Sequence, residues 1–415
     1  MDVDVTEVKA AAVRIADLIQ RTPMLPSRYW SEVAGGRVWL KAECLQRTGS
    51  FKLRGAANMI RMLTPEERAR GVVAASAGNH AQGVAVAARA EGVRAVVVMP
   101  TSASFAKVEA ARSYGAEVVL EGASYAEAAQ AMRRLAAEQG LTVIPAFDDE
   151  RVIAGQGTVG LEIVAQCPDV ELVLVPVGGG GLAAGVGLAV KTLRPAVRVV
   201  GVQAAAAPAA RESFIHRHPR TVHPRVTIAD GIAVSRPGDV TLPFLLRYLD
   251  DLVAVDEESI TGAMVALLER SKLVVEGAGA VGAAALLARA VDARNRITVV
   301  ILSGGNIDMN LLGRVVEHGL AHAGRYLVVR VALHDRPGQL ARVLRVLADA
   351  GANVLDIYHR RTGSHLTFGQ VQVELLLETR NAAHAEAVCA ALEAHGYHES
   401  PVLESASVTR VFVAE

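Results

Sequence analysis

The chain has 415 residues, with 43 basic and 43 acidic side chains and an apolar content of 51%. This length predicts two or three domains with a large core, because domains commonly hold about 100–200 residues. A formal net charge of zero, without any basic run, argues against nucleic acid or an acidic lipid surface as a partner.

The cysteines and the first residues favour a cytoplasmic location. Cys44, Cys167 and Cys389 lie far apart without histidines at metal-ligand spacing, so we interpret them as reduced thiols. The first residues are acidic and contain no apolar run, so no signal peptide is expected. An uncharged stretch at 172–190 is interrupted by Pro176 and several glycines, which favours a buried strand, turn and helix over a membrane span. We therefore expect no membrane partner.

Residues 1–320 alternate short β-branched runs with longer alanine-rich stretches that are typical of helices. The apolar runs expected to form strands are 94–99, 116–120, 172–177, 197–202 and 297–302. Such near-continuous Val, Ile and Leu runs indicate strands buried on both faces, as in a parallel sheet between helix layers. The pattern predicts a two-lobed α/β region, with a small lobe at about 47–147 and a large lobe formed by 1–46 and 148–320.

Residues 325–415 follow a different pattern. The expected elements, in order, are a strand at 326–333, an amphipathic helix around 340–347, strands at 354–359 and 371–377, a helix at 382–395 and a strand near 408–413, with a turn at Thr362–Ser364. This βαββαβ order predicts a separate ferredoxin-like domain. Because the domain is too small for a deep active site, we expect it to bind a ligand or to regulate.

Three turns of small residues follow strands and open helices: Ser76–His80, Gly178–Gly181 and Ser303–Asn306. Four successive glycines before a helix free their N–H groups to bind an anion, although such a run could also be a flexible linker. A Walker loop would place Lys-Ser/Thr after the glycines, and a dinucleotide fold would place an acid where Gln203 stands. Pyridoxal phosphate remains, because it needs a phosphate site, polar partners for its ring and a lysine amine, for which Lys52 is the candidate.

Six segments together resemble the fold-type II pyridoxal-phosphate enzymes, most closely the threonine ammonia-lyases that carry one C-terminal ACT domain. These segments are 50–56, 76–83, 178–181, 227–233, 275–280 and 303–306. They occur in the family's order across nearly the whole first 310 residues. The turn at 335–338, with 351–353, resembles an ACT domain. The resemblance implies a catalytic region of the tryptophan-synthase-β type.

The resemblance also implies the residues that hold the cofactor. Lys52 would bind it covalently as an imine and, once released, would take the Cα proton of the substrate. Gly178, Gly179, Gly180 and Gly181 would bind the phosphate, Asn79 the ring 3′-oxygen, and Ser303 would face the pyridine nitrogen. Because an unperturbed lysine has a pKa of ~10.4, the pocket must favour the neutral amine.

The substrate would bind at a second group of residues. Its carboxylate would lie on the turn formed by Ser76, Ala77, Gly78, Asn79 and His80, through N–H groups and the dipole of the following helix. Ser50 could assist there. Glu276 would contact the substrate amine or the cofactor edge, with the alternative that it only balances a helix dipole.

Departures from related patterns separate the rival activities. Serine racemases of this fold carry a second serine where Ala77 stands, which favours a lyase here. Cysteine-synthase-like enzymes follow the lysine with Asp-Arg, where this chain has Leu53-Arg54. A third alternative is an amino-acid sensor without catalysis.

No metal site is expected. The position of a divalent-cation acid in relatives is taken by Gln203 and alanines, although backbone oxygens could still hold a monovalent ion. We interpret the nearby His216 and His218 as part of a solvated loop rather than as metal ligands.

The predicted activity is β-elimination of L-threonine to 2-oxobutanoate and ammonia, with L-serine to pyruvate as a side activity. Asp335 and Asn353 match ACT positions that bind amino-acid effectors, such as isoleucine or valine. The alternative is structural, with Asp335 capping a helix and Asn353 at a turn. The resemblance further implies a homo-oligomer, commonly a tetramer.

Overall fold

The computed structural model describes residues 3–361, 368–399 and 409–414. The chain divides into two compact units, Met1–Asp308 and Met309–Glu415. Within the described residues, no helix has both the length and the apolar character needed to span a membrane.

A six-stranded sheet forms the centre of the larger lobe of the first unit. Its strand order is β1-β2-β10-β7-β8-β9. The strand bounds are Met24–Ser27 (β1), Arg37–Lys41 (β2), Leu172–Pro176 (β7), Arg198–Ala204 (β8), Asp251–Val255 (β9) and Ile297–Ile301 (β10). β1 pairs antiparallel with β2, and all other neighbours are parallel. The apolar runs at 172–177, 197–202 and 297–302 thus form neighbouring strands, and β7 and β10 are buried along their whole length.

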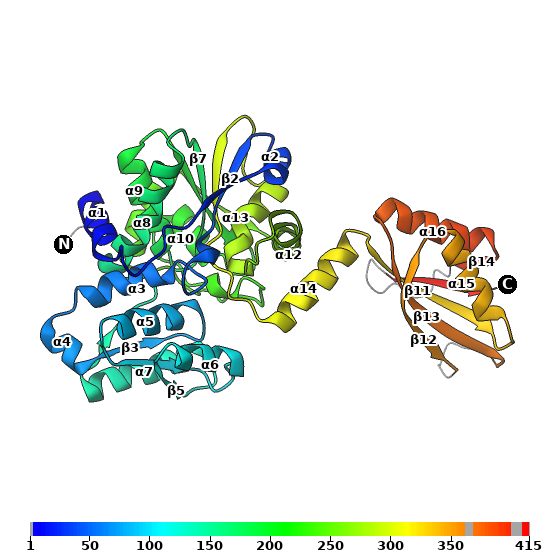
Figure 1. Cartoon of the computed structure of the whole chain (residues 1–415), viewed down its shortest axis with the longest axis horizontal. Coiled ribbons are helices and arrows are strands. Elements are labelled where there is room, and N and C mark those ends of the chain that lie inside the picture. The colour runs from blue at the N-terminus through cyan, green and yellow to red at the C-terminus, as the bar shows by residue number, and fades with distance from the viewer. Residues whose placement is uncertain (1–2, 362–367, 400–408, 415) are drawn as a thin grey trace. The chain divides into compact units, whose positions relative to one another are not determined.

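Helices cover both faces of this sheet, with α8 and α9 on one face and α12 and α13 on the other (Figure 1). The helices of this lobe are α1 (Val5–Arg14), α2 (Arg28–Ala34), α8 (Glu150–Gln166), α9 (Gly181–Leu193), α10 (Ala209–His216), α11 (Thr241–Tyr248), α12 (Glu257–Ala266) and α13 (Gly277–Leu287), with 3-10 turns at Glu43–Leu45 and Asp230–Ile232 and a π-helical turn at Leu267–Ser271.

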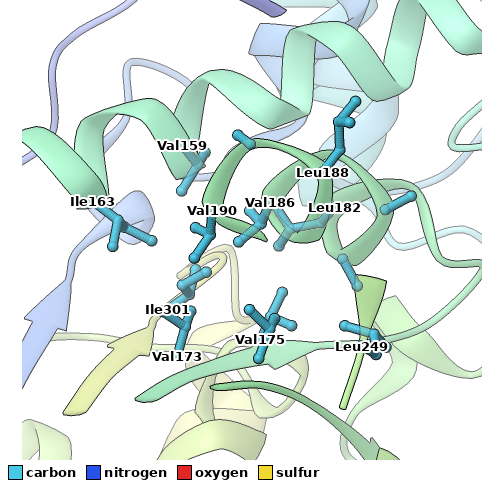
Figure 2. Close-up of a cluster of buried hydrophobic side chains, with 14 of the residues drawn as sticks. Val159, Ile163, Val173, Val175, Leu182, Val186, Leu188, Val190, Leu249 and Ile301 are labelled. Atoms are coloured by element: carbon cyan, nitrogen blue, oxygen red, sulfur yellow. The ribbon is translucent and has the colours of Figure 1, made fainter. Parts of the chain in front are cut away.

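The main core of this lobe lies between α8, α9 and the sheet. Figure 2 shows Val186 and Val190 of α9 pointing toward Val173 and Val175 of β7. α8 and α9 pack closely because Gly185 has no side chain, and a Cβ there would overlap the carbonyl of Ile153. The packed core fixes the start of α9, and therefore the glycine turn before it.

A four-stranded parallel sheet forms the smaller lobe, in the order β5-β4-β3-β6. Its elements are α3 (Lys52–Arg61), α4 (Pro65–Arg70), β3 (Val72–Ala75), α5 (Asn79–Ala90), β4 (Ala95–Met99), α6 (Phe105–Ser113), β5 (Glu117–Leu120), α7 (Tyr125–Gln139) and β6 (Thr142–Val143). The predicted α/β class with mostly parallel sheets is confirmed. The turns after β3, β7 and β10 all lie at carboxyl ends of parallel strands, where ligands of such sheets bind.

The second unit is a five-stranded sheet with helices packed on it. It consists of α14 (Met309–His322), β11 (Tyr326–His334), α15 (Gln339–Asp349), β12 (Asn353–Arg360), β13 (Gln370–Glu378), α16 (Ala382–Ala394), β14 (Tyr397–Glu399) and β15 (Thr409–Ala414), in the strand order β12-β13-β11-β15-β14. The predicted βαββαβ order is present, and β14 is an additional short strand antiparallel to β15. The turn predicted at Thr362–Ser364 lies outside the described residues.

Candidate active site

Lys52 is the first residue of α3 and its side chain is partly buried. The Nζ atom donates a hydrogen bond to the carbonyl of Ala146 at 2.9 Å. Burial lowers the pKa of Lys52 to about 8, against the opposing charge of Glu276. A larger fraction of neutral, nucleophilic amine is therefore present near pH 7 than for an ordinary lysine.

The glycine turn after β7 presents an unpaired row of N–H groups. None of the amides of Gly178 to Gly181 donates to an acceptor in the part of the chain that the structure describes. Gly180 has a φ of +101°, which side chains rarely adopt, and a Cβ on Gly179 would overlap the ring of Phe147. The amides precede α9, so the positive end of its dipole adds to an anion site.

This turn is held in place by its neighbours. The Thr241 hydroxyl donates to the carbonyl of Gly179 at 2.6 Å. Asp148 accepts from the amides of Val240 and Thr241, at 2.9 and 3.2 Å, and so fixes the start of α11. The turn is therefore a supported cradle, and the alternative of a flexible linker does not fit it.

Asn79 and Glu276 meet across the site from different elements. Asn79 begins α5 and its Nδ2 donates to Glu276 Oε1 at 2.7 Å. Glu276 is the N-cap residue of α13, but its side chain accepts no capping bond. The pKa of Glu276 is raised to about 7, mainly by burial and then by the charge of Asp230. The alternative that Glu276 serves only as a helix-start acid is therefore not favoured.

The turn after β10 runs beside the segment that carries Lys52. Ser50 forms a single antiparallel bridge with Gly304, and the Phe51 amide donates to the carbonyl of Ser303 at 3.1 Å. Ser50 Oγ is fully buried and has no hydrogen-bond partner among the described residues. A buried orphan hydroxyl is costly, which fits a group that awaits a ligand.

The turn after β3 also leaves amides free at the start of a helix. Ser76 Oγ accepts from the Gly78 amide at 3.1 Å, whereas the amides of Ala77, Asn79 and His80 have no acceptor among the described residues. The His80 ring instead turns into the protein, where Nε2 donates to the carbonyl of Ile144 at 2.8 Å. Burial lowers the pKa of His80 to about 3, so the ring is neutral.

Asp335 and Asn353 belong to the second unit. α15 has Gly338 as its N-cap, without a side-chain capping bond, so the alternative that Asp335 caps this helix is wrong. Asp335 lies 3.4 Å from Arg361, and Asn353 donates to Glu378 at 3.1 Å. Both residues are exposed on the isolated chain.

Several residues of the site had no separate signal in the sequence. The segment 144–148 accepts from His80 and Lys52, places Phe147 on the glycine turn and supplies Asp148. Asn306, the last residue of the Ser-Gly-Gly-Asn turn, donates to Asn79 Oδ1 at 2.6 Å. Asn306 was part of a motif found in the sequence, but its contact with Asn79 can be seen only in the folded structure. Among the described residues, no three His, Cys, Asp or Glu side chains are grouped as metal ligands.

The Lys52 amine, the glycine amides and the Asn79 side chain match a known family. Residues 15–304 match the family model described as pyridoxal-phosphate dependent enzyme. The chain belongs to this family. Its C-terminal residues 327–395 match the ACT domain model. The family and the ACT domain predicted from the sequence are therefore confirmed, and the cofactor is pyridoxal phosphate.

Similar proteins cover most of this pyridoxal-phosphate enzyme. A Thermotoga maritima protein named L-threonine ammonia-lyase is 46% identical over 94% of this chain and 97% of its own length. The solved structure of a T.th. threonine deaminase is 43% identical, with a TM-score of 0.70, over 74% of this chain and 99% of that one. A maize serine racemase structure is 35% identical, with a TM-score of 0.73, over 78% and 99%.

The described residues fit this cofactor. Its phosphate matches the four free amides of Gly178–Gly181 at the start of α9, its aldehyde matches the partly buried amine of Lys52, and its polar ring matches the amide of Asn79. Side chains at these glycine positions would overlap Ile232, Phe147 or Thr241, so the close packing that supports the cradle depends on their absence.

Proposed function

We propose that this enzyme is a threonine ammonia-lyase, which converts L-threonine to 2-oxobutanoate and ammonia and L-serine to pyruvate more slowly. The observation that carries the proposal is the amine of Lys52, with its lowered pKa, in one site with the free glycine amides and the Asn79–Glu276 pair. The named relatives support the same reaction class.

Each side chain has a chemical part in this proposal. When bound, pyridoxal phosphate supplies an aldehyde and an electron-withdrawing ring that stabilises negative charge at Cα. Lys52 holds the cofactor and then takes the Cα proton, for which a pKa of about 8 is well matched. The free amides of the Ser76–His80 turn bind the substrate carboxylate, and the unpartnered hydroxyl of Ser50 assists there. Glu276 accepts from Asn79 Nδ2 at 2.7 Å and would contact the substrate amine or the cofactor edge.

Racemisation is the first alternative, because a serine racemase is among the similar structures. Inversion at Cα needs a second acid or base on the opposite side of the ring. Ala77, which stands where serine racemases of this fold carry their second serine, has no side-chain proton to exchange. The lyase is therefore the better supported activity, and β-replacement and a non-catalytic sensor remain rivals for the assay to separate.

The experiment is a product assay on purified protein with L-threonine and L-serine as substrates. We expect 2-oxobutanoate and ammonia in equal amounts, slower formation of pyruvate, and no D-serine. Lys52→Ala should lose both the bound-cofactor absorbance and product formation. Dominant D-serine formation, or a product only when a thiol is added, would replace the proposal with racemisation or β-replacement. Ligand binding without turnover would favour a sensor.

We further propose that an amino acid such as isoleucine or valine regulates the enzyme through Asp335 and Asn353 of the ACT domain. Both side chains are exposed on the isolated chain and come from the turn after β11 and the start of β12. A cytoplasmic location accords with the three free, buried cysteines. The proposal of a homotetramer rests on the family resemblance.

A further inference from the structure

We propose that Asn306 is a positioning residue that fixes which end of the Asn79 amide faces the cofactor. This inference rests on the proposed role of Asn79 in binding the cofactor ring. The side-chain hydrogen bonds of Asn306 go to Thr48, Asn79 and Gln82. Asn306 acts through the side chain of Asn79, whose Oδ1 accepts from Asn306 Nδ2 at 2.6 Å.

The two ends of the Asn79 amide are nearly the same in shape but opposite in chemistry. The NH₂ end donates two hydrogens and the oxygen end only accepts, so an amide that reverses would present an oxygen where a donor is needed. Glu276 lies at the NH₂ end at 2.7 Å, but with a pKa near 7 its carboxyl can be protonated and then donate. A carboxyl with two protonation states does not fix the amide by itself.

Asn306 has only one favourable amide orientation, and this orientation fixes that of Asn79. Its Nδ2 faces three oxygen acceptors, which are Thr48 O at 2.7 Å, Asn79 Oδ1 at 2.6 Å and Gln82 Oε1 at 3.2 Å. If Asn306 reversed, it would place oxygen against these acceptors. The other end has room because Gly49 has no side chain, and a Cβ there would come within 2.5 Å of Asn306 Oδ1. The orientation of Asn306 is thus determined by its surroundings, and it determines that of Asn79.

The same amide joins three parts of the site. Thr48 precedes Lys52 by four residues, Asn79 begins α5, and Asn306 ends the turn after β10. Because Asn306 bonds to a backbone oxygen of the first segment and to a side chain of the second, it sets Asn79 relative to the strand–helix turn that carries Lys52. One hydrogen of Asn79 Nδ2 is used by Glu276, and the second remains for an acceptor on the cofactor.

A double-mutant cycle tests the inference. Cofactor-free protein is prepared as wild type, Asn79→Ala, Asn306→Ala and the double variant, and each is titrated with pyridoxal phosphate. The Kd and the absorbance maximum of bound cofactor are recorded. Each single variant should weaken binding about three- to tenfold, as expected for one hydrogen bond. If Asn306 acts through Asn79, the double variant should bind pyridoxal phosphate no more weakly than Asn79→Ala does. If the fold-change in Kd of the double variant equals the product of the two single fold-changes, the inference is overturned.

Two further variants keep the result decisive. Asn306→Asp preserves the shape but places oxygen against Asn79 Oδ1, so it should weaken binding and shift the absorbance maximum. A folded Asn306→Asp protein with wild-type Kd and spectrum would overturn the inference. Asn58→Ala is the matched control, because Asn58 is a buried asparagine that bonds to Arg151 O away from the site, and it should leave the Kd unchanged.

The titrations distinguish failure of the proposed role of Asn79 from failure of the positioning role of Asn306. If Asn79→Ala leaves the Kd unchanged, the proposed role of Asn79 is wrong and the inference falls with it. If Asn79→Ala weakens binding while the effect of Asn306 is independent, only the positioning role of Asn306 is wrong.

Discussion

Arg54 and Glu43 form a fully buried, bidentate ion pair. Arg54 lies two residues after Lys52 in α3. Arg54 Nε and Nη2 each donate to one carboxylate oxygen of Glu43 at 2.8 Å, and both side chains have no exposed surface. Arg54 also donates to Glu162 at 2.6 Å, and Glu162 in turn accepts from Lys41. The first turn of α3, which places Lys52, is therefore anchored by these ion pairs to the 3-10 turn Glu43–Leu45 and to α8, and through Glu162 to Lys41 of β2.

Arg54→Met should destabilise the protein by about 3–5 kcal/mol, because it leaves the fully buried Glu43 carboxylate without its ion-pair partner. The free energy of unfolding is measured by urea denaturation of cofactor-free protein. Arg94→Met is the matched control. Arg94 makes the same bidentate contact with Glu117, at 2.9 and 2.8 Å, but that pair is about half exposed and should lose at most about 1 kcal/mol. Equal losses for the two variants would contradict the anchoring role.

The covalent capture of pyridoxal phosphate should show the lowered pKa of Lys52. A neutral amine is the reactive form, so the rate of capture by cofactor-free protein should rise with pH through a midpoint of about 8. A free lysine would have its midpoint near ~10.4. Stopped-flow absorbance over pH 6.5–10 measures the rate, and Lys52→Ala should show no such phase. A midpoint at the free-lysine value would mean that burial does not tune this amine.

Glu276 should make the cofactor-free protein less stable as pH rises from about 4.5 to about 7. Its pKa is about 7 in the folded chain, against 4.5 for an ordinary glutamate, so the folded state holds a proton that the unfolded state has released. Protonated Glu276 therefore contributes about 2–4 kcal/mol to the free energy of unfolding. This contribution is fully present below pH 4.5 and is lost as the pH rises through 7. Glu276→Gln should remove this slope, as measured by urea unfolding at each pH, and the exposed Glu109→Gln should keep it. An unchanged slope in Glu276→Gln would refute the assignment.

The fold was largely predictable because its strands are continuous apolar runs. Residues 172–177 and 297–302 could only be buried strands or short buried helix segments, and the glycine-rich turns after them favoured strands. The short strand β14, Tyr397–Glu399, has three residues and is too brief to show an alternating pattern.

The segments that form the site could be predicted from the sequence, but the hydrogen bonds and ion pairs between their side chains could not. Asn79 and Glu276 are 197 residues apart in the chain, and nothing in their spacing indicates that they share a hydrogen bond. Arg54 stands in a helix where a charge is normally exposed, and its burial depends on acids from two other elements. Contacts of this kind depend on tertiary packing, which local sequence patterns do not contain.

Asp335→Asn in the full-length enzyme should weaken the binding of isoleucine or valine about tenfold, because it removes the negative charge that would pair with the ligand ammonium group. Calorimetric titration measures the affinity, and the rate of 2-oxobutanoate formation without effector should be unchanged. Asp349→Asn is the control, since Asp349 is an exposed acid at the end of α15 in the same unit. Unaltered affinity in Asp335→Asn would show that the effector binds elsewhere or that none binds.

Lys107 and Asp230 should tune Glu276 in opposite directions. Lys107 lies on α6 of the smaller lobe and Asp230 on the 3-10 turn of the larger lobe, with Nζ and Oδ2 3.5 Å apart. The charge of Asp230 raises the pKa of Glu276 and that of Lys107 lowers it. Asp230→Asn should therefore move the pKa of Glu276 down, and Lys107→Met should move it up. The pH dependence of unfolding free energy in each variant measures this, with Glu276→Gln as the background in which both effects vanish. Because both side chains are partly exposed, added salt should shrink both shifts. Shifts of the same sign in the two variants would mean that the substitutions change the packing between the lobes rather than the local charge.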